Sequence, residues 1–356
     1  MVNWGILGTG AIANAFANSI KASKDSTLYA VASRSNSNAE KFAKEFRCIG
    51  LRGYQNLIED PAIDAIYVAL PHNYHFEFTL KALKYRKPVL CEKPMTINSE
   101  DTMILIDVAR KYKTLLMEAF MYRTHPQTFK IKEIIQQEFS EEPLHIEASF
   151  GFEANVSKEN RLLNPSLGGG SILDIGCYPM SFSRMIVGVQ ESKLFINPSS
   201  IEAKGELSSE GIDLFSSANL EFNNGSKASI SCAINQNLPN SVVISNKNKS
   251  LTINQPWNCG EFEGRRSKLF LYKDKESVTI EIDEKLGVFT HEINHFVSLI
   301  KSKLLESSLV SHSDSLGNMS NLDTWRGQLG VKYKEDQPEN RTSNPFLKEN
   351  KHTNKK

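Results

Sequence analysis

The sequence predicts a protein in two parts: an α/β domain with a doubly wound parallel sheet, followed by an α+β domain with a large, mostly antiparallel open sheet. Three observations support this fold class. A short apolar strand leads directly into a glycine-rich turn at Gly8–Ala13. Up to about residue 122, buried runs of strand length alternate with amphipathic helices. Beyond that point, alternating strands with tight turns predominate, which is typical of an antiparallel sheet with one free face.

The length of 356 residues allows two separate cores. Because the composition changes near residue 122, we expect a first domain over residues 1–121 and a second over 122–334. Residues 335–356 are polar and rich in Lys and Asn, which predicts a disordered tail.

Charge and cysteine content exclude several classes of protein. Lys and Arg number 42 against 41 Asp and Glu, so nothing favours nucleic acid or an anionic membrane as a partner. No apolar run approaches the roughly 20 residues of a membrane-spanning helix, and residues 1–7 lack the features of a signal peptide. The five cysteines form no Cys-x-x-Cys pair, so we expect reduced thiols in a cytoplasmic protein.

The first strand, residues 4–7, runs into Gly8-Thr9-Gly10-Ala11-Ile12-Ala13. In this G-x-G-x-x-A pattern Gly8 permits the tight turn, Gly10 lets a pyrophosphate approach the backbone, and Ala13 lets the helix pack close to the strand. The helix over 13–22 would direct its free N–H groups at the phosphates. The context therefore predicts a dinucleotide-binding Rossmann domain whose cofactor contacts include Gly8, Thr9, Gly10, Ala11 and Ile12.

The second strand, residues 28–32, ends in Ser33-Arg34-Ser35. An enzyme that uses NAD usually carries Asp or Glu near this position to bind the ribose 2′-hydroxyl. Ser33 and Arg34 instead offer a hydroxyl and a guanidinium fork, which suit a 2′-phosphate. We therefore expect NADP(H) as the preferred cofactor, with NAD(H) as the alternative. Arg34 could otherwise be a solvated loop residue.

Two further strands bring polar residues to the same edge of the sheet. Strand 65–70 is followed by Pro71-His72-Asn73-Tyr74-His75, and strand 89–91 by Glu92-Lys93-Pro94. The ligand crevice of such a sheet lies at the carboxyl ends of its strands. We therefore expect the cofactor site to include Leu70, Pro71, His72, Asn73, His75, Glu92 and Lys93. Two alternatives stay open: His75 could cap the next helix, and Lys93-Pro94 could simply form a turn after the strand.

The remaining elements complete both domains. In the first domain we expect helices over 38–46, 76–84 and 99–111 and a fifth strand over 114–119. In the second domain we expect helices over 127–139, 174–187, 290–303 and 316–329. The strands expected there cover 145–151, 212–222, 227–235, 241–245, 250–254, 268–273 and 277–282.

One motif resembles a zinc site but is incomplete. Residues 291–295, His-Glu-Ile-Asn-His, match the HExxH pattern of zinc proteases. A zinc site needs a third protein ligand, which nothing downstream supplies. Ile293, Phe296 and Ile300 form an adequate apolar face for an ordinary docking helix. We therefore expect no metal site.

The motifs together resemble a known family. Glu92-Lys93-Pro94 after a G-x-G-x-x-A domain, with Asp174-Ile175-Gly176-Cys177-Tyr178 in the second domain, resemble the glucose–fructose oxidoreductase/inositol dehydrogenase (Gfo/Idh/MocA) family over residues 1 to about 333. Residues 117–127 and 314–319 resemble the branch that contains dimeric dihydrodiol dehydrogenase and NADP-dependent D-xylose dehydrogenase. Inositol dehydrogenases typically carry His where this chain has Tyr178, so Tyr178 is expected to take that role.

The resemblance implies an NAD(P)-dependent dehydrogenase or reductase that transfers a hydride between nicotinamide and a carbinol or carbonyl carbon of a sugar, polyol or cyclic diol. Tyr178 and Lys93 would form the acid–base pair, with Asp174 orienting substrate hydroxyls and Arg123 near the nicotinamide. A free phenol has a pKa near 10, and a cation within about 4 to 6 Å favours the phenolate. Lys93 is therefore expected to lower the pKa of Tyr178. The alternative is a structural role for both residues, in which Asp174 caps helix 174–187 and Tyr178 belongs to the core.

Other functions stay open at this stage. One is an oxidoreductase that acts on a nucleotide-linked sugar in biosynthesis, or a glycosidase of NAD-dependent type. Another is a non-catalytic NADP(H)-binding sensor, against which the intact Lys93 and Tyr178 argue. The second domain would bind substrate, and the resemblance implies that its open sheet pairs with another subunit. We expect a homodimer or homotetramer through residues 212–282.

Overall fold

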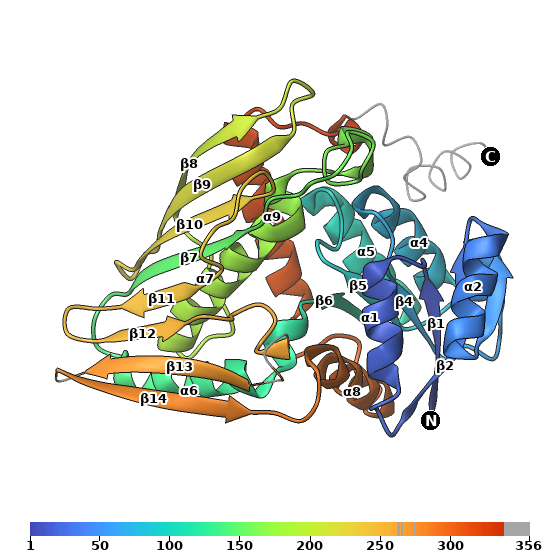
Figure 1. Cartoon of the computed structure of the whole chain (residues 1–356), viewed down its shortest axis with the longest axis horizontal. Coiled ribbons are helices and arrows are strands. Elements are labelled where there is room, and N and C mark those ends of the chain that lie inside the picture. Colours follow the sequence, from blue (N-terminus) through green and yellow to red (C-terminus); the bar gives the residue numbers. More distant parts are fainter. Residues whose placement is uncertain (262–263, 265, 274, 338–356) are drawn as a thin grey trace, which may run out of the picture.

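The computed structural model describes residues 1–261, 264, 266–273 and 275–337 and contains two large sheets with helices packed between and around them (Figure 1). The tail predicted to be disordered lies, from residue 338 onward, outside the described residues. Among the described residues, no helix combines the length and the hydropathy needed to cross a bilayer.

The first sheet is parallel and has the order β3-β2-β1-β4-β5-β6. The order reverses beside β1, so the carboxyl ends of β1 and β4 form the switch point where such sheets bind ligands. Its strands are β1 (Val2–Leu7), β2 (Ser26–Ser33), β3 (Ile49–Arg52), β4 (Ala65–Val68), β5 (Val89–Glu92) and β6 (Leu116–Ala119). Its helices are α1 (Ala11–Ile20), α2 (Asn36–Phe46), α3 (Tyr54–Glu59), α4 (His72–Lys84) and α5 (Ser99–Tyr112).

Local chemistry explains these elements. Every residue of β4, β5 and β6 is buried, as expected for parallel strands covered on both faces. In α1, Ala13, Phe16 and Ala17 are buried, which is the spacing of one helix face. The Asn98 side chain accepts a hydrogen bond from the Asp101 N–H at 2.9 Å and caps α5.

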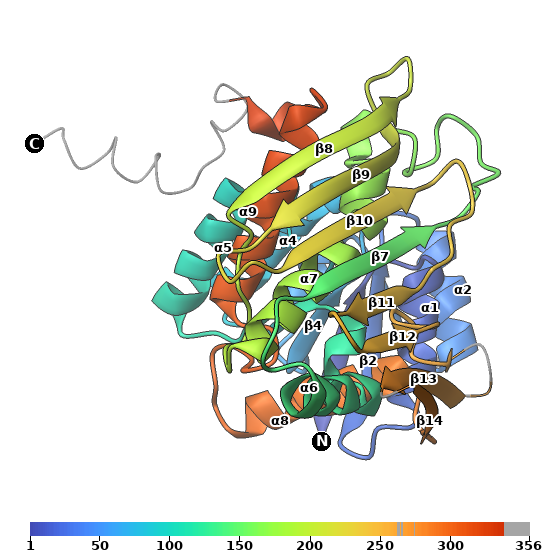
Figure 2. The same cartoon turned by 90° about the vertical axis from the view of Figure 1, so that its left-hand side faces the viewer.

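The second sheet has the order β14-β13-β12-β11-β7-β10-β9-β8 and is antiparallel except for the parallel pair β7–β10. One face packs on helices, and the other is turned to the viewer in Figure 2. Its strands are β7 (His145–Gly151), β8 (Ser200–Leu207), β9 (Asp213–Glu221), β10 (Lys227–Ala233), β11 (Val242–Ser245), β12 (Ser250–Ile253), β13 (Arg266–Lys273) and β14 (Glu276–Asp283). The accompanying helices are α6 (Pro126–Glu138), α7 (Cys177–Gln190), α8 (Val288–Lys301) and α9 (His312–Gln328), with short helical segments η1 (Met121–Thr124), η2 (Pro165–Leu167), η3 (Ile172–Gly176) and η5 (Lys334–Asp336).

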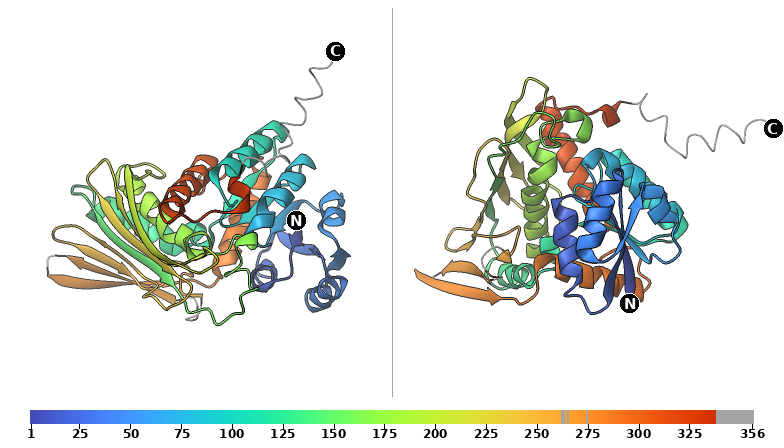
Figure 3. Two further views of the ribbon diagram at one scale, coloured as in Figure 1. Left: turned by 90° about the horizontal axis from the view of Figure 1, so that it is seen from above. Right: turned by 45° about the vertical axis from the view of Figure 1, so that its right-hand side comes forward.

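The two parts of the chain are closely packed. α7 and α9 lie between the sheets (Figure 3), where α9 contacts α5. α8, although late in the chain, returns to α1 of the first sheet. There the Phe296 ring lies 5.3 Å from the Trp4 ring, and the Thr290 hydroxyl donates to the Ser19 carbonyl at 3.2 Å. One apolar core therefore continues from the first sheet into the second.

The fold class predicted from the sequence is confirmed, with corrections to its elements. The parallel sheet has six strands rather than five, because β3 was missed along with α3, and β8 was missed in the second sheet. β3 is a short edge strand with Ile49 exposed, and six of the eight residues of β8 are exposed. Neither segment carries a buried apolar pattern. The domain boundary predicted after residue 121 falls within η1 and stays a prediction.

Candidate active site

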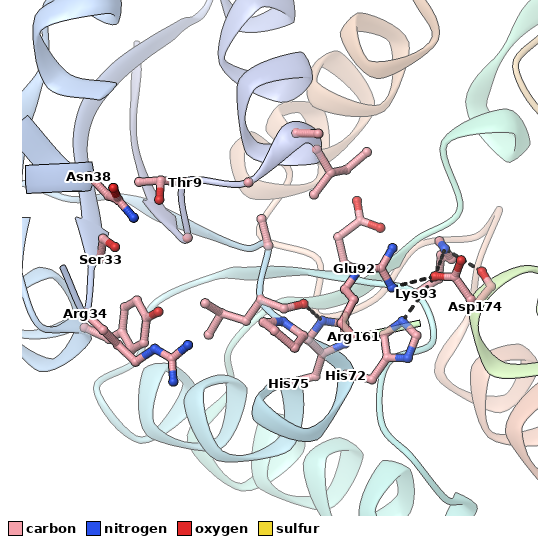
Figure 4. Close-up of a pocket in the computed structure, with 18 of the residues that line it drawn as sticks. Thr9, Ser33, Arg34, Asn38, His72, His75, Glu92, Lys93, Arg161 and Asp174 are labelled. Carbon is pink, nitrogen blue, oxygen red and sulfur yellow. Dashed lines mark hydrogen bonds and ion pairs between the residues drawn. The ribbon is translucent and has the colours of Figure 1, made fainter. Parts of the chain in front are cut away.

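A cavity of about 670 Å³ lies at the carboxyl ends of β1, β2, β4 and β5, and Arg161, Asp174 and Tyr178 of the second domain complete its wall (Figure 4). Such a volume is typical of small-molecule and cofactor sites. The structure brings together nearly all residues that the sequence predicted for the site. Those that line the cavity are Gly8, Thr9, Gly10, Ala11, Ile12, Ser33, Arg34, Leu70, Pro71, His72, His75, Glu92, Lys93, Asp174 and Tyr178.

The turn after β1 leaves open space where a pyrophosphate would bind. Gly8 has φ +112°, and a Cβ there would lie 2.3 Å from the Ala69 carbonyl oxygen, so only glycine fits. A Cβ on Gly10 would meet nothing within 4 Å. Gly10 is also the N-cap of α1, and no side chain caps its free N–H groups. This cradle fits a dinucleotide phosphate.

The other end of the cavity carries hydroxyl and guanidinium groups. Arg34 stacks over the Tyr74 ring at 5.3 Å and donates to its hydroxyl at 3.3 Å. The Ser33 hydroxyl lies buried at the end of β2, and the Ser35 hydroxyl caps α2. Among the described residues, the acidic ones that line the cavity are Glu92 and Asp174, which lie at its far end (Figure 4). These donors fit a 2′-phosphate better than a free 2′-hydroxyl.

Two histidines of α4 lie beneath the cavity and are neutral. The sequence placed them in a loop, but α4 begins at His72 with Pro71 as its N-cap, so His75 does not cap it. Burial lowers the pKa of His72 to about 3 and that of His75 to about 4. His72 Nδ1 lies 2.8 Å from the Gly168 carbonyl. His75 lies between the carbonyls of Leu70 and Pro94, at 2.7 and 2.8 Å.

Three basic side chains surround the Asp174 carboxylate. Its Oδ1 lies 2.8 Å from Arg161 Nη1, 3.7 Å from His72 Nε2 and 4.0 Å from Lys93 Nζ. Burial raises the pKa of Asp174, but Lys93, Arg161 and His72 outweigh burial and bring it to about 2. Lys93 Nζ also donates to the Asp174 main-chain oxygen at 2.7 Å. Asp174 lies within the π-helical segment η3 and does not act as a helix cap.

Tyr178 lies at the start of α7, and its side chain is both part of the core and part of the cavity wall. Its ring packs against Phe120, Phe150 and Trp257 at centroid distances of 5.7, 5.3 and 5.7 Å. Lys93 Nζ lies 5.1 Å from the Tyr178 ring centroid. The expected lowering of the pKa of Tyr178 is wrong: burial, followed by the charge of Glu92, raises it well above 10. Tyr178 therefore carries its proton at neutral pH.

The sequence did not predict Ser35, Asn38, Tyr54, Ala69 and Arg161, which also line the cavity, or Tyr67, which contacts the cavity residue Glu92. Arg161 lies on the loop between β7 and η2, and no motif marked it. Tyr67 on β4 donates its hydroxyl proton to Glu92 Oε1, and burial raises the pKa of Glu92. Tyr67 and Glu92 lie on neighbouring parallel strands, but only the pairing of the strands reveals that they meet.

Two predicted residues do not reach this cavity. Asn73 lines a separate cavity on another side of α4. Arg123 is fully buried, and its Nη2 lies 2.6 Å from Asp314 Oδ2. It therefore forms an ion pair inside the core and does not line the cofactor site.

The HExxH histidines do not converge on a common point. His291 faces Glu284 at 3.6 Å, whereas His295 contacts the Ser307 hydroxyl at 2.8 Å. Within the described residues, no group of three candidate ligands could hold a metal.

Comparison with known proteins gives matches along most of the chain. Residues 2–120 match the family described as "Oxidoreductase family, NAD-binding Rossmann fold", and residues 129–252 match the "GFO/IDH/MocA C-terminal domain". A trans-1,2-dihydrobenzene-1,2-diol dehydrogenase of Xenopus tropicalis is 32% identical over 337 residues, covering 93% of this chain and 98% of that protein. D-xylose 1-dehydrogenase (NADP(+)) 2 of Haloferax volcanii is 30% identical over 229 residues, covering 64% and 68%.

A solved structure agrees with the fold over nearly the whole length. KijD10, a 3-ketoreductase from Actinomadura kijaniata solved in complex with NADP and TDP-benzene, superposes with a TM-score of 0.81 at 24% identity. The match covers 92% of this chain and 97% of that chain.

Proposed function

The chain belongs to the Gfo/Idh/MocA oxidoreductase family, and on that premise we propose that it transfers a hydride between NADP(H) and a carbinol or carbonyl carbon of a sugar, polyol or cyclic diol. The family resemblance and the enzyme class expected from the sequence, an NAD(P)-dependent dehydrogenase or reductase acting on CH–OH groups, are confirmed. The observation that carries the finer proposal is the convergence of Lys93, Asp174 and Tyr178 at one end of the dinucleotide cavity.

The residues present fit NADP(H). Gly8, Gly10 and the N-terminus of α1 would hold the pyrophosphate, and Ser33 and Arg34 would hold the 2′-phosphate. The Haloferax volcanii relative is named for NADP(+), which supports this choice. The bound dinucleotide would supply or accept the hydride.

Residues of the cavity wall would donate the proton and stabilise the charge that accompany hydride transfer. Tyr178 holds a proton at Oη, because burial keeps its pKa well above 10, and it would donate this proton to the oxygen of a carbonyl substrate. Lys93 would stabilise the negative charge that develops on that oxygen. Asp174, ionised beside Arg161 and Lys93, would accept hydrogen bonds from substrate hydroxyls. A protonated Tyr178 favours carbonyl reduction near neutral pH, and alcohol oxidation should accelerate as the pH rises.

The names of the relatives suggest the substrates to test first. A spectrophotometric screen should compare D-xylose and other aldoses, inositols and trans-cyclohexadiene diols with NADP+, following the absorbance of the reduced dinucleotide. We expect turnover with at least one sugar or diol. No turnover in either direction, together with tight NADPH binding, would favour the sensor function.

A nucleotide-linked sugar is a second candidate substrate. The observation that favours it is Arg161, whose side chain lies in the cavity wall and is 46% exposed, so it could bind a diphosphate. The same screen should therefore include dTDP-linked and UDP-linked keto sugars with NADPH. A kcat/KM for these that exceeds the value for free sugars by tenfold or more would assign the chain to this class.

We also propose a homodimer or homotetramer formed through the outer face of the second sheet. Figure 2 shows this face with no described helix in front of it. Its central groove is lined by small and polar side chains such as Ser149, Ser217, Ser229 and Ser231. Side chains of this size allow another sheet to approach closely. Light scattering at micromolar concentration tests the proposal, and a monomeric mass would contradict it.

A further inference from the structure

The glycine-rich loop before η3 is held by residues from three distant parts of the chain. His72, from α4, lies 2.8 Å from the Gly168 carbonyl. The hydroxyl of Tyr333, near the end of the described chain, donates to the Gly169 carbonyl at 2.6 Å. Asp213, at the start of β9, accepts hydrogen bonds at the end of the loop. These anchors fix where η3 begins, and therefore where Asp174 and Tyr178 lie.

Asp213 accepts two of these hydrogen bonds. Its Oδ2 accepts from the Ile172 N–H at 2.6 Å and from the Ser171 hydroxyl at 2.8 Å. The carboxyl is fully buried, and among the described residues its Oδ1 has no hydrogen-bond partner. A Cβ on Gly170, which has φ +121°, would lie 2.2 Å from Oδ1, so the loop backbone packs directly on this oxygen.

We infer that Asp213 is a positioning residue of the active site, holding the first turn of η3 in place and thereby aligning Asp174 and Tyr178 with Lys93. Asp213 does not line the cavity, and it acts through Ser171, Ile172 and the loop backbone at Gly170. The inference rests on the proposed function for its kinetic consequences, but its geometric part can be tested without turnover.

Ionisation of Asp213 controls the strength of this anchor. Burial raises the pKa of Asp213 to about 6, although the Ile172 N–H and the Ser171 hydroxyl act in the opposite direction. The titratable groups that face it are Cys232 and Tyr333, and burial raises the pKa of both, so they stay uncharged. Below pH 6 a proton from solvent would add to Oδ1. Oδ2 would then accept the same two bonds without its charge, and such bonds are about half as strong.

Protonation of Asp213 should affect kcat and stability in opposite directions. Because the folded-state pKa of Asp213 lies above its unfolded value of 3.8, the contribution of this group to stability increases as the pH falls from 6 to 4. A positioning role predicts that kcat falls in that same window. A residue with a purely structural role would leave kcat unchanged in that window.

The test compares Asp213→Asn with the wild type. We expect Asp213→Asn to lower kcat roughly tenfold to a hundredfold, the range expected for misplaced catalytic groups, while the NADPH dissociation constant changes less than twofold. The wild-type kcat should show an acidic limb near pH 6, and Asp213→Asn should lack it. Tryptophan emission of the cofactor-free protein gives a second readout, because Trp257 contacts Tyr178 and Trp325 contacts Gly176. The emission should titrate near pH 6 only in the wild type.

Two further variants complete the design. Ser171→Ala removes one bond that lowers the pKa of Asp213, so its acidic limb should move above pH 6; it also replaces Asp213→Asn if that variant fails to fold. Tyr333→Phe loosens the same loop without removing the titrating group, so it should keep the limb near pH 6. If neither the Asp213→Asn nor the Ser171→Ala change alters kcat, its pH profile or the emission titration, the inference is overturned. Absent turnover with an intact emission titration would instead refute only the proposed function.

Discussion

Replacing Lys93 with Met should reduce kcat far more than it weakens cofactor binding. Lys93 Nζ lies 5.1 Å from the Tyr178 ring centroid, and its side chain is 14% exposed. A unit charge at about 5 Å in a medium of effective dielectric constant about 20 contributes ~3 kcal/mol to stabilising a developing anion. That free energy corresponds to a factor of about a hundred or more in rate. Asp174 keeps Arg161 at 2.8 Å, so it should stay ionised.

The assay is steady-state kcat together with the NADPH dissociation constant for Lys93→Met, Tyr178→Phe and the double variant. Tyr178→Phe removes the proton donor and keeps the ring, so we expect a loss of roughly a hundredfold to ten-thousandfold in kcat. Because the two residues should act as a unit, the double variant should be little slower than the slower single variant.

The chain supplies matched controls for both changes. Lys87 lies two residues before β5 begins, at the end opposite Lys93, and its Nζ donates to the carbonyls of Asp60 and Ile63 at 2.7 and 2.8 Å. Tyr122 belongs to the same aromatic cluster as Tyr178, but its hydroxyl donates to Ser181 in the core at 2.9 Å. Lys87→Met and Tyr122→Phe should affect stability and leave kcat unchanged. If Tyr178→Phe keeps kcat within about threefold, Tyr178 does not transfer the proton.

Three other predictions concern the cofactor, the assembly and stability. Arg34→Asp should lower kcat/KM for NADP roughly tenfold to a hundredfold, because a bidentate phosphate contact is lost; equal kcat/KM for NAD and NADP in the wild type would refute the preference. Ser231→Arg, in the groove of the outer sheet face, should shift the particle toward monomer in light scattering, and an unchanged mass would argue against this interface. Glu292 is buried with no hydrogen-bond partner among the described residues, and burial raises its pKa well above 4.5. The free energy of unfolding of the wild type, measured in urea, should therefore fall as the pH rises above 4.5. Glu292→Gln should lack this pH-dependent loss. If both proteins show the same pH dependence, the prediction is wrong.

The sequence was sufficient for the parts of the fold that depend on local pattern. A strand, the turn at Gly8 and a small-residue helix establish the first βα unit, and alternating runs reveal most of the second sheet. β3 and β8 were missed because exposed edge strands carry little apolar pattern. The start of α4 was misplaced because His72, Asn73 and Tyr74 are weak helix formers, and their helix depends on tertiary packing.

The candidate site was predictable where strand ends define it. Lys93 follows a buried strand, and Asp174 and Tyr178 belong to one motif, so the structure brings the three together as expected. Arg123 could not be placed, because its partner Asp314 lies 191 residues further along the chain. The pKa of Tyr178 was unpredictable for the same kind of reason. Its burial depends on rings from several separate segments, and that burial outweighs any effect of the nearby lysine.

The return of α8 to the first sheet has a consequence for how the molecule unfolds. Because Phe296 packs on Trp4 and Ser23 donates to Asn294 at 2.8 Å, a fragment ending near residue 121 would expose an aromatic surface that the intact chain covers. The two halves should therefore melt in a single cooperative transition, despite their separate sheets. The same contacts between α8 and the first sheet limit hinge opening between the halves. Substrate exchange at the cavity should therefore proceed through local movement of residues 156–160, which are mostly exposed and precede the anchored glycines.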